Sequence, residues 1–226
     1  MFGRRAMTPT KILQLNEEQW RQGDLLRVTP RRRWDADPEA RRMVVRRREV
    51  GEFALAPMRW GLMPERQDGE QLLRPLINVR AEAVGAQAEW RRLLNTRRCI
   101  VPAEQFFEWL RVGDMKAKEY LFRLRSRRPM MIAALWNRAP AGGKTVETFA
   151  YISCEANRLV SQVHDRMPVV LDDAGVKEWF NPDATLDTLL ALLKPFDDGE
   201  LECQPVSNAP ARARPYQPLL FASRAA

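Results

Sequence analysis

Pro129-Met130-Met131-Ile132-Ala133-Ala134-Leu135-Trp136 is the stretch of this 226-residue chain that decides its fold. The run is apolar throughout and has the length of a strand, and a glycine-containing loop follows it over 139–144. A second run over 148–153 carries the aromatic and β-branched residues that strands favour. Two such runs joined by a short loop predict a β-hairpin.

Short strands and brief helices are expected on both sides of this hairpin. The strands are expected at 25–30, around 43–45, at 52–63 with an interruption at Pro57, at 98–101 before Pro102, at 120–124 and at 201–207. The helices are expected at 16–23, from 81, and at 89–94, 157–163, 172–179 and 185–193. Because the strands are short and mostly joined as hairpins, the sequence predicts one α+β domain over 1–226, with a mostly antiparallel, barrel-like β core and flanking short helices.

The composition indicates a globular protein with a surplus of positive charge. Hydrophobic residues make up 45% of the chain and charged residues 29%, and 37 Lys and Arg against 29 Asp and Glu give a net charge of +8. Arginines are densest over 31–48. The surplus favours a polyanionic partner such as DNA. A coding bias towards arginine, or a solvated charged surface, would give the same composition, so both interpretations stay open.

The cysteines indicate a reducing compartment. Cys99, Cys154 and Cys203 are an odd number without metal-ligand spacing, so neither a disulfide framework nor a metal site is expected. The basic residues after Met1 are not followed by an apolar segment, and no apolar run approaches the ~18 residues of a membrane span. We therefore expect a cytoplasmic monomer that uses no metal and no cofactor.

His164 is the only histidine, and it is the one side chain suited to proton transfer near neutral pH. Arg166 follows two residues later, and in an extended segment it shares a face with the imidazole. An acid–base group beside a planar cation suits a phosphate-bearing substrate. Pro168 predicts that the segment leaves a helix into a loop or a strand. The alternative is a helix-end histidine that only bonds a carbonyl group.

Three further polar residues stand among apolar neighbours. Asn78 shares a strand face with Arg80, Glu108 lies between two aromatic residues, and Ser153 ends the returning strand. A carboxylate in such surroundings can act as an acid–base group. With His164, these residues would suit a carbonyl group on a phosphate-linked substrate. Alternatively, Glu108 forms a structural ion pair with an arginine and Asn78 caps a turn.

An ordered series of motifs resembles one known family. The motifs are Gly3-Arg4, Arg59-Trp60-Gly61-Leu62-Met63-Pro64, Asn78-Val79-Arg80-Ala81-Glu82, Arg98-Cys99-Ile100-Val101-Pro102-Ala103, Phe106-Phe107-Glu108-Trp109, Ala134-Leu135-Trp136, Glu155-Ala156-Asn157, His164-Asp165-Arg166-Met167-Pro168 and Pro205-Val206-Ser207. Together they resemble the SRAP family, the SOS-response-associated peptidases or abasic-site processing proteins, over residues 1–208. Residues 209–226 form a tail beyond the resemblance.

The resemblance implies an α+β domain around a β-barrel-like core, with a basic groove that binds single-stranded or abasic-site DNA. Family members lose the initiator methionine, and the cysteine behind it closes a thiazolidine ring with the abasic aldehyde. The resemblance further implies that Asn78 holds the sugar or the N-terminal residue, that Glu108 orients the amine and that His164 moves protons. The residues implied to contact DNA are Arg4, Arg80, Arg166, Ser153, Trp60 and Pro30, the arginines at phosphates and the last two beside flanking bases.

Phe2 departs from the family, because it stands where the resemblance implies the nucleophilic cysteine. Phenylalanine has no thiol, so the thiazolidine is not expected, and a bulky second residue disfavours removal of Met1. Three routes remain. The α-amine forms a Schiff base with the aldehyde, the protein binds damaged or single-stranded DNA without covalent chemistry, or a second thiol such as Cys154 takes over.

The older name of the family points to a peptidase instead. In that interpretation His164 and Glu108 assist a nucleophile at the N-terminus. Phe2 cannot attack a peptide bond, and Ser153 is a weak replacement.

Overall fold

The computed structural model describes residues 13–15, 41–47, 53–63, 75–113, 115–141 and 144–206. The helix predicted at 16–23, the strand predicted at 25–30 and the candidate residues Met1, Phe2, Arg4 and Pro30 lie outside these residues. Among the described helices, none combines the length and the apolar character that a bilayer crossing needs.

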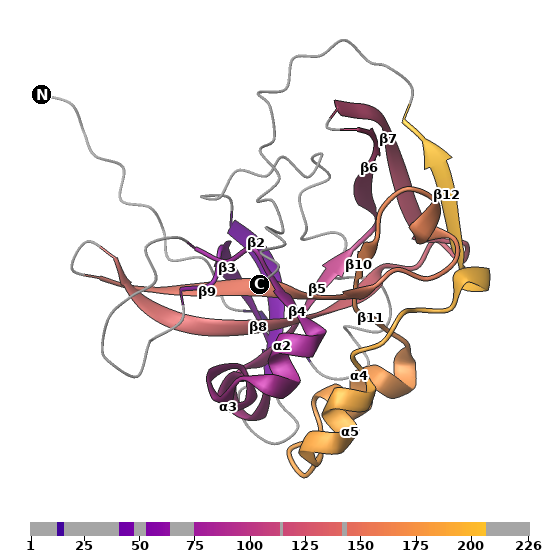
Figure 1. Cartoon of the computed structure of the whole chain (residues 1–226). Coiled ribbons are helices and arrows are strands. Elements are labelled where there is room, and N and C mark those ends of the chain that lie inside the picture. Colours follow the sequence, from indigo (N-terminus) through magenta and orange to yellow (C-terminus); the bar gives the residue numbers. More distant parts are fainter. Residues whose placement is uncertain are drawn as a thin grey trace, which may run out of the picture.

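Five strands close into a barrel at the centre of the molecule (Figure 1). They are β2 (Arg41–Arg47), β3 (Phe53–Trp60), β5 (Arg98–Ala103), β8 (Met130–Ala141) and β9 (Lys144–Glu155). The antiparallel neighbours follow the order β3-β2-β5-β8-β9, and a short parallel pairing of β3 with β9 closes the ring. The predicted α+β fold with a mostly antiparallel, barrel-like core is confirmed.

Four shorter strands extend the barrel. β1 (Leu13–Leu15) pairs with β3, and β11 (Val170–Leu171) pairs with β8. β4 (Asn78–Arg80) and β10 (Arg166–Pro168) both pair with the last residues of β9. These two strands carry several of the predicted site residues, so the end of β9 is where the site forms.

A three-stranded sheet with the order β12-β7-β6 stands beside the barrel, at the upper right of Figure 1. It consists of β6 (Phe106–Val112), β7 (Met115–Leu124) and β12 (Leu201–Pro205). Only residues 104 and 105 separate β5 from β6, so the chain passes directly from the barrel into this sheet. The stacked rings of Phe106 and Phe122, with centroids 4.9 Å apart, hold β6 against β7.

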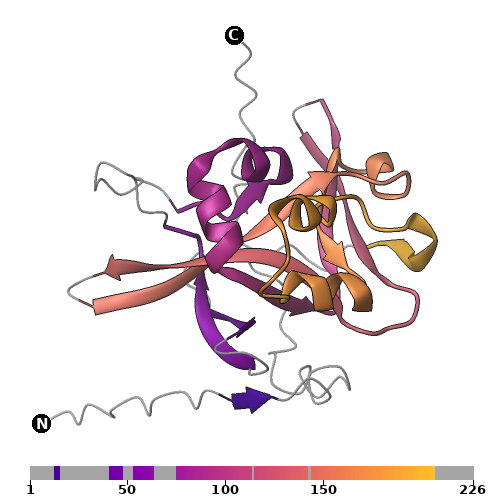
Figure 2. The same ribbon diagram turned by 90° about the horizontal axis from the view of Figure 1, so that it is seen from below.

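Helices cover the outside of the barrel (Figure 2). They are α2 (Ala81–Ala86), α3 (Ala88–Thr96), α4 (Asp173–Trp179) and α5 (Leu186–Ala191), which confirms the four helices predicted in these regions. The side chains of Asp172 and Thr185 accept the backbone N–H groups of Gly175 and Thr188 at 2.6 and 3.2 Å. Such N-caps explain why α4 and α5 begin where the sequence indicates.

The prediction of a helix at 157–163 is wrong. The segment forms a single 3-10 turn, η2 (Val160–Gln162). The side-chain oxygen of Asn157 accepts the N–H of Val160 at 2.9 Å, and its amide donates to the carbonyl of Phe196 at 2.8 Å. An asparagine that bonds nearby backbone offers the chain an alternative to a helix. A second 3-10 turn, η3 (Asp198–Glu200), precedes β12.

The predicted hairpin forms the two longest elements of the fold. β8 and β9 pair antiparallel from Ala134 and Tyr151 to Ala141 and Lys144, so the strands run through most of the loop predicted at 139–144. In Figures 1 and 2 the hairpin projects to the left, away from α4, α5 and the second sheet.

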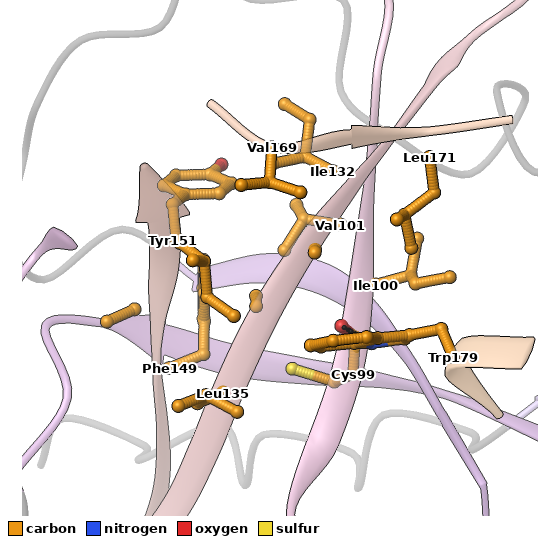
Figure 3. Packing of buried hydrophobic residues seen from close by; sticks show 14 of the residues in the cluster. Cys99, Ile100, Val101, Ile132, Leu135, Phe149, Tyr151, Val169, Leu171 and Trp179 are labelled. Atoms are coloured by element: carbon orange, nitrogen blue, oxygen red, sulfur yellow. Dashed lines mark hydrogen bonds between the residues drawn. The ribbon is translucent and has the colours of Figure 1, made fainter. Parts of the chain in front are cut away.

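The core lies inside the barrel and between the barrel and α4. Figure 3 shows Phe149 and Tyr151 of β9 on one side and Trp179 of α4 beside Cys99 and Ile100 on the other. Phe149 and Tyr151 meet edge to face, with centroids 5.3 Å apart. Trp179 is fully buried and donates its Nε1–H to the Cys99 carbonyl at 3.0 Å. Truncating such an indole costs about 3–5 kcal/mol, so it fixes α4 to β5.

Two strands continue through prolines at which the sequence predicted a break: an interruption at Pro57 and a strand end before Pro102. β3 continues through Pro57 and β5 through Pro102. Among the described strands, β1 pairs with β3 only as far as Leu55 and β9 only from Arg59, so the edge of β3 at Pro57 needs no N–H donor. Pro102 likewise lies beyond the pairing of β5 with β2, which ends at Ile100. The predicted interruptions are wrong because a strand tolerates proline where its edge lacks a partner.

Gly61 turns the chain after β3 and so places β4. Its φ of +119° is favourable for glycine alone, and a Cβ atom there would lie 2.8 Å from Cβ of Pro75. Its N–H donates to the Phe149 carbonyl at 2.9 Å, and a bridge between Leu62 and Leu76 follows. These contacts bring β4 alongside β9 as a continuation of β3.

Candidate functional site

Three neighbouring strands carry four of the predicted site residues, Asn78, Arg80, Ser153 and Arg166. β4 and β10 pair with opposite edges of β9, which places Arg80, Ser153 and Pro168 in one row. Asn78 lies two positions earlier on β4, and His164 lies two positions before β10. The register places Asn78 beside Tyr151 and Arg80 beside Ser153, and it places Arg166 beside Glu155 on the other edge of β9.

The imidazole of His164 is held by its own segment. Its Nδ1 accepts a hydrogen bond from the backbone N–H of Arg166 at 3.0 Å. In the neutral ring this bond leaves the proton on Nε2. When the ring is protonated, Nδ1–H faces the Arg166 carbonyl at 3.3 Å and the Asp165 carboxylate at 3.2 Å. The ring has partners in both protonation states, as a group that exchanges protons needs.

The other ring nitrogen faces Glu108. Nε2 of His164 lies 4.0 Å from Oε2 of Glu108, which β6 contributes from the second sheet. The two side chains remain 23% and 29% exposed, so a ligand can reach both. The gap is longer than a hydrogen bond, and one inserted ligand atom or a small movement would bridge it. The structure brings these two predicted residues together, and their catalytic role stays a prediction.

Arg166 points inward, where Glu82 binds it. The Nη1 and Nη2 atoms of Arg166 donate to the two carboxylate oxygens of Glu82 at 2.7 and 2.9 Å, and Nη2 also donates to the Ser153 carbonyl at 2.7 Å. Arg166 is 8% exposed, so this bidentate pair is partly shielded from water. The hydrogen bond from Arg166 is the main reason why the pKa of Glu82 lies below its ordinary value of 4.5.

Glu82 is the residue of this site that was not predicted. It lies in the first turn of α2, where an acidic residue ordinarily indicates only a favourable helix dipole. Its partner Arg166 is 84 positions away, and no spacing rule connects the two. The available signal was the position of Glu82 two residues after Arg80, within a motif that already held Asn78.

The residues predicted to contact DNA differ in exposure. Arg80 is exposed, whereas Ser153 is 5% exposed, and within the described residues its Oγ has no hydrogen-bond partner. Trp60 is 8% exposed and donates its Nε1–H to the Ile77 carbonyl at 2.9 Å, so it supports the residue before Asn78 from inside. Their contacts with DNA, like those of Arg166, stay predictions.

The thiol nearest to the site in sequence is buried. Cys154 is 2% exposed, its Sγ faces the Met167 carbonyl at 3.8 Å, and burial raises its pKa to about 11. Adjacent strand positions face opposite sides of the sheet, so Cys154 points away from the side of Ser153. These features disfavour Cys154 as a substitute nucleophile. All three cysteines are free.

Within the described residues, neither a group of metal ligands nor the pocket beside η2 coincides with the predicted residues. Across the described ranges, no three His, Cys, Asp or Glu residues are grouped as metal ligands. A pocket of about 330 Å³ opens beside η2 and is lined by Arg125, Arg158, Leu159, Gln162, Asp198 and Gly199. It contains none of the predicted residues, so the candidate site is defined by the contacts of His164.

Comparisons with known proteins agree with this fold and these motifs. The sequence profile of the family described as SOS response associated peptidase (SRAP) matches residues 1–211. The chain is 36% identical over 158 residues to the abasic site processing protein YoqW of Bacillus subtilis (strain 168), covering 68% of this chain and 70% of that protein. It is 26% identical over 236 residues to the abasic site processing protein HMCES of Xenopus tropicalis, covering 90% of this chain and 69% of that protein.

Solved structures show the same fold. A protein from Bordetella bronchiseptica superposes with a TM-score of 0.65 at 25% identity, covering 80% of this chain and 89% of that one. A protein from Bacteroides thetaiotaomicron superposes with a TM-score of 0.64 at 23% identity, covering 75% of each chain. The overall fold is therefore shared beyond this chain.

Proposed function

The chain belongs to the SOS response associated peptidase (SRAP) family, and from this membership we propose that it binds and processes abasic sites in DNA. Relatives from Bacillus subtilis and Xenopus tropicalis are named abasic site processing proteins. A net charge of +8 suits a polyanionic ligand. The proposed ligand is single-stranded DNA that carries the lesion; a monomeric state and a cytoplasmic location stay predictions.

The observation that carries this proposal is the pair formed by His164 and Glu108. Ring opening of the abasic sugar removes a proton from the C1′ hydroxyl group, breaks the bond from C1′ to the ring oxygen, and returns a proton to that oxygen. An imidazole that accepts a proton in one step and donates it in the next can serve both steps, with the carboxylate balancing its charge. Such acid–base assistance contributes about 10²–10⁴-fold to a rate.

The same pair favours a Schiff base as a second candidate activity. An amine lone pair adds to the aldehyde carbon, the carbonyl oxygen gains a proton, and the resulting hydroxyl group leaves as water after a second proton arrives. The nitrogen gives up both of its protons over these two stages, so one imine forms for each water released. His164 can supply and recover these protons. Phe2 supplies no thiol to trap the imine as a thiazolidine, so the bond would be reversible.

A peptidase receives less support from the site. Ser153 is buried with its carbonyl bound by Arg166, and the Cys154 thiol has a raised pKa of about 11. A nucleophile must be accessible and activated by a neighbouring base. Neither side chain meets both conditions.

Incubation with abasic single-stranded DNA, with and without borohydride, tests the proposal. We expect a salt-sensitive complex with the DNA, a covalent product only after reduction, and no heat-stable product without the reductant. A heat-stable product without borohydride would contradict the loss of thiazolidine chemistry. Absence of both complex and product would contradict abasic-site processing itself. The intact mass of the protein would show whether Met1 is retained.

A further inference from the structure

A second concentration of positive charge lies at the opposite end of β9 from the candidate site. The guanidinium carbons of Arg46, Arg97 and Arg138 lie 4.6, 4.4 and 5.9 Å from the ring centroid of Trp136. Arg46 comes from β2, Arg97 from the end of α3, and Arg138 from β8 beside Trp136. We call these four residues the arginine–tryptophan cluster.

The arginines of the cluster are incompletely neutralised. Oε1 of Glu147 lies 3.2 Å from Nη2 of Arg46 and 3.3 Å from Nε of Arg138. Arg97 has no ion pair within the described residues, and burial followed by the charges of Arg138 and Arg46 lowers its pKa. Three cations around one carboxylate repel one another, and an added anion would relieve this repulsion.

The cluster is also held in place before any ligand arrives. Trp136 is 4% exposed and forms a fixed platform, and the Arg46 side chain is 14% exposed. The Nε atom of Arg46 is buried and, in the described part of the chain, has no hydrogen-bond partner. The Arg138 side chain, by contrast, is 54% exposed. Planar guanidinium groups fixed over an aromatic ring are suited to bidentate binding of phosphate.

We propose that the arginine–tryptophan cluster binds backbone phosphates of the DNA strand at a distance from the lesion, an inference that rests on the proposed function. Glu147 beside the cluster and Ser153 in the candidate site lie on one strand, six positions apart. That separation is about 20 Å at ~3.3 Å per residue. It corresponds to roughly six nucleotides when the strand keeps the ~3.4 Å rise per nucleotide of a B-form duplex, and to fewer when the strand is more extended. One strand of DNA can therefore reach both places, which favours nucleic acid over an acidic protein as the ligand.

Binding of abasic single-stranded DNA by the full chain tests this inference. One DNA is shorter than the separation of the two sites, and one is several times longer. For the double variant Arg97→Gln and Arg138→Gln we expect about tenfold weaker binding of the long DNA and a salt slope reduced by about 1.4, which is ~0.7 for each phosphate that the variant no longer neutralises. Binding of the short DNA should not change. The control is Arg128→Gln, since Arg128 is 65% exposed and pairs with Asp173 outside the cluster.

Unchanged affinity and an unchanged salt slope in the double variant would overturn the inference. The same result is expected if the cluster binds an acidic protein instead of DNA. Wild-type protein that binds neither DNA would overturn the proposed function and this inference with it. If the double variant does not fold, Arg97→Lys and Arg138→Lys replace it. These keep the charges and lose the bidentate donors, so we expect an unchanged salt slope with weaker binding of the long DNA. If the lysine variant binds the long DNA, like the short DNA, with the affinity of the wild type, the proposed phosphate site is contradicted.

Discussion

Among single residues, Glu82 is connected to His164 through Arg166. Glu82 binds the guanidinium group of Arg166, and the backbone N–H of Arg166 fixes Nδ1 of His164. The Arg166 side chain is 9% exposed. Removing the Glu82 carboxylate would therefore leave the guanidinium charge shielded from water, and among the described residues the Ser153 carbonyl would remain as its hydrogen-bond acceptor. We therefore expect Glu82 to act as a positioning residue for His164, the proposed proton-transfer group.

Replacing Glu82 by glutamine should lower both activity and stability. We expect a loss of about 1–2 kcal/mol in the free energy of unfolding. This loss is smaller than that for a fully buried ion pair, because the Glu82 side chain is 56% exposed. The pKa of Glu82 is lowered in the folded state, first by the hydrogen bond from Arg166. The contribution of Glu82 to the free energy of unfolding is therefore fully present above pH 4.5, the ordinary pKa of the group. It is lost as the pH falls through the lower pKa of the folded state. Urea unfolding from neutral to acidic pH measures this.

In that measurement the wild type and Glu82→Gln should differ at neutral pH and converge in acid. A difference that stays constant over the whole pH range would contradict the ion-pair explanation. Abasic-DNA processing measured at neutral pH, where both proteins are folded, should fall in the variant because the His164 imidazole loses its fixed orientation.

The cysteines should differ in reactivity with iodoacetamide. The Cys154 thiol has a pKa raised to about 11, so roughly one molecule in a thousand carries the thiolate at pH 8. Cys99 is fully buried, whereas Cys203 is only partly buried. Alkylation of the native protein, followed by mass spectrometry, should modify Cys203 first. Early modification of Cys154 would restore the thiol route that the structure disfavours.

His164, Glu108 and Asn78 could be selected as candidates because their chemistry stands out locally; the structure brings His164 and Glu108 within 4.0 Å, and the roles of all three stay predictions. A single histidine and a carboxylate between aromatic residues are visible without a fold. Glu82 and the arginine–tryptophan cluster could not be predicted, because each depends on side chains that only the closed barrel brings together.

At the scale of elements, Arg98 ties two helices to the barrel. From the start of β5 it donates to the carbonyls of Leu94 and Asn95 at 2.7 and 3.1 Å, at the end of α3. It also donates to the carbonyls of Trp179 and Asn181, at the end of α4. Carbonyl groups at helix ends lack partners within the helix, and a cation satisfies them and the helix dipole together.

Arg98→Ala should destabilise the protein by about 2–4 kcal/mol, because several charge-assisted hydrogen bonds are lost at once. Arg98→Lys keeps the charge without the planar set of donors, so we expect a smaller loss. Thermal unfolding measures both variants, with Arg128→Gln as the control at an exposed arginine. Equal melting temperatures for Arg98→Ala and wild type would show that water replaces these bonds without cost.

Elements with periodic patterns and caps could be predicted, and elements set by neighbouring strands could not. Asp172 and Thr185 mark the starts of α4 and α5 in the sequence itself. Strand continuity at Pro57 depends on where β1 and β9 stop pairing with β3, which no local pattern reveals. The length of the β8–β9 hairpin depends in the same way on its cross-strand pairs.

At the scale of the whole molecule, closure of the barrel sets the positions of both proposed sites. The barrel was predicted, but the parallel pairing of β3 with β9 that closes it was not, because parallel contacts join segments distant in sequence. β9 then carries the candidate site at its end and the neighbour of the arginine–tryptophan cluster near its start. Arg46 and Arg138 pair with Glu147 near the start of this strand, and Arg80 and Arg166 lie beside its end.

The preference for abasic over intact single-stranded DNA is the decisive quantity, measured as the ratio of the two dissociation constants for wild type, His164→Gln and Glu108→Gln. We predict that wild type prefers abasic DNA and that both variants lose most of this preference while their melting temperatures and binding of intact DNA stay near wild type. A lower melting temperature with an unchanged ratio would indicate that Glu108 is only structural. A ratio unchanged in both variants would contradict the proposal that His164 and Glu108 form the site that engages the lesion.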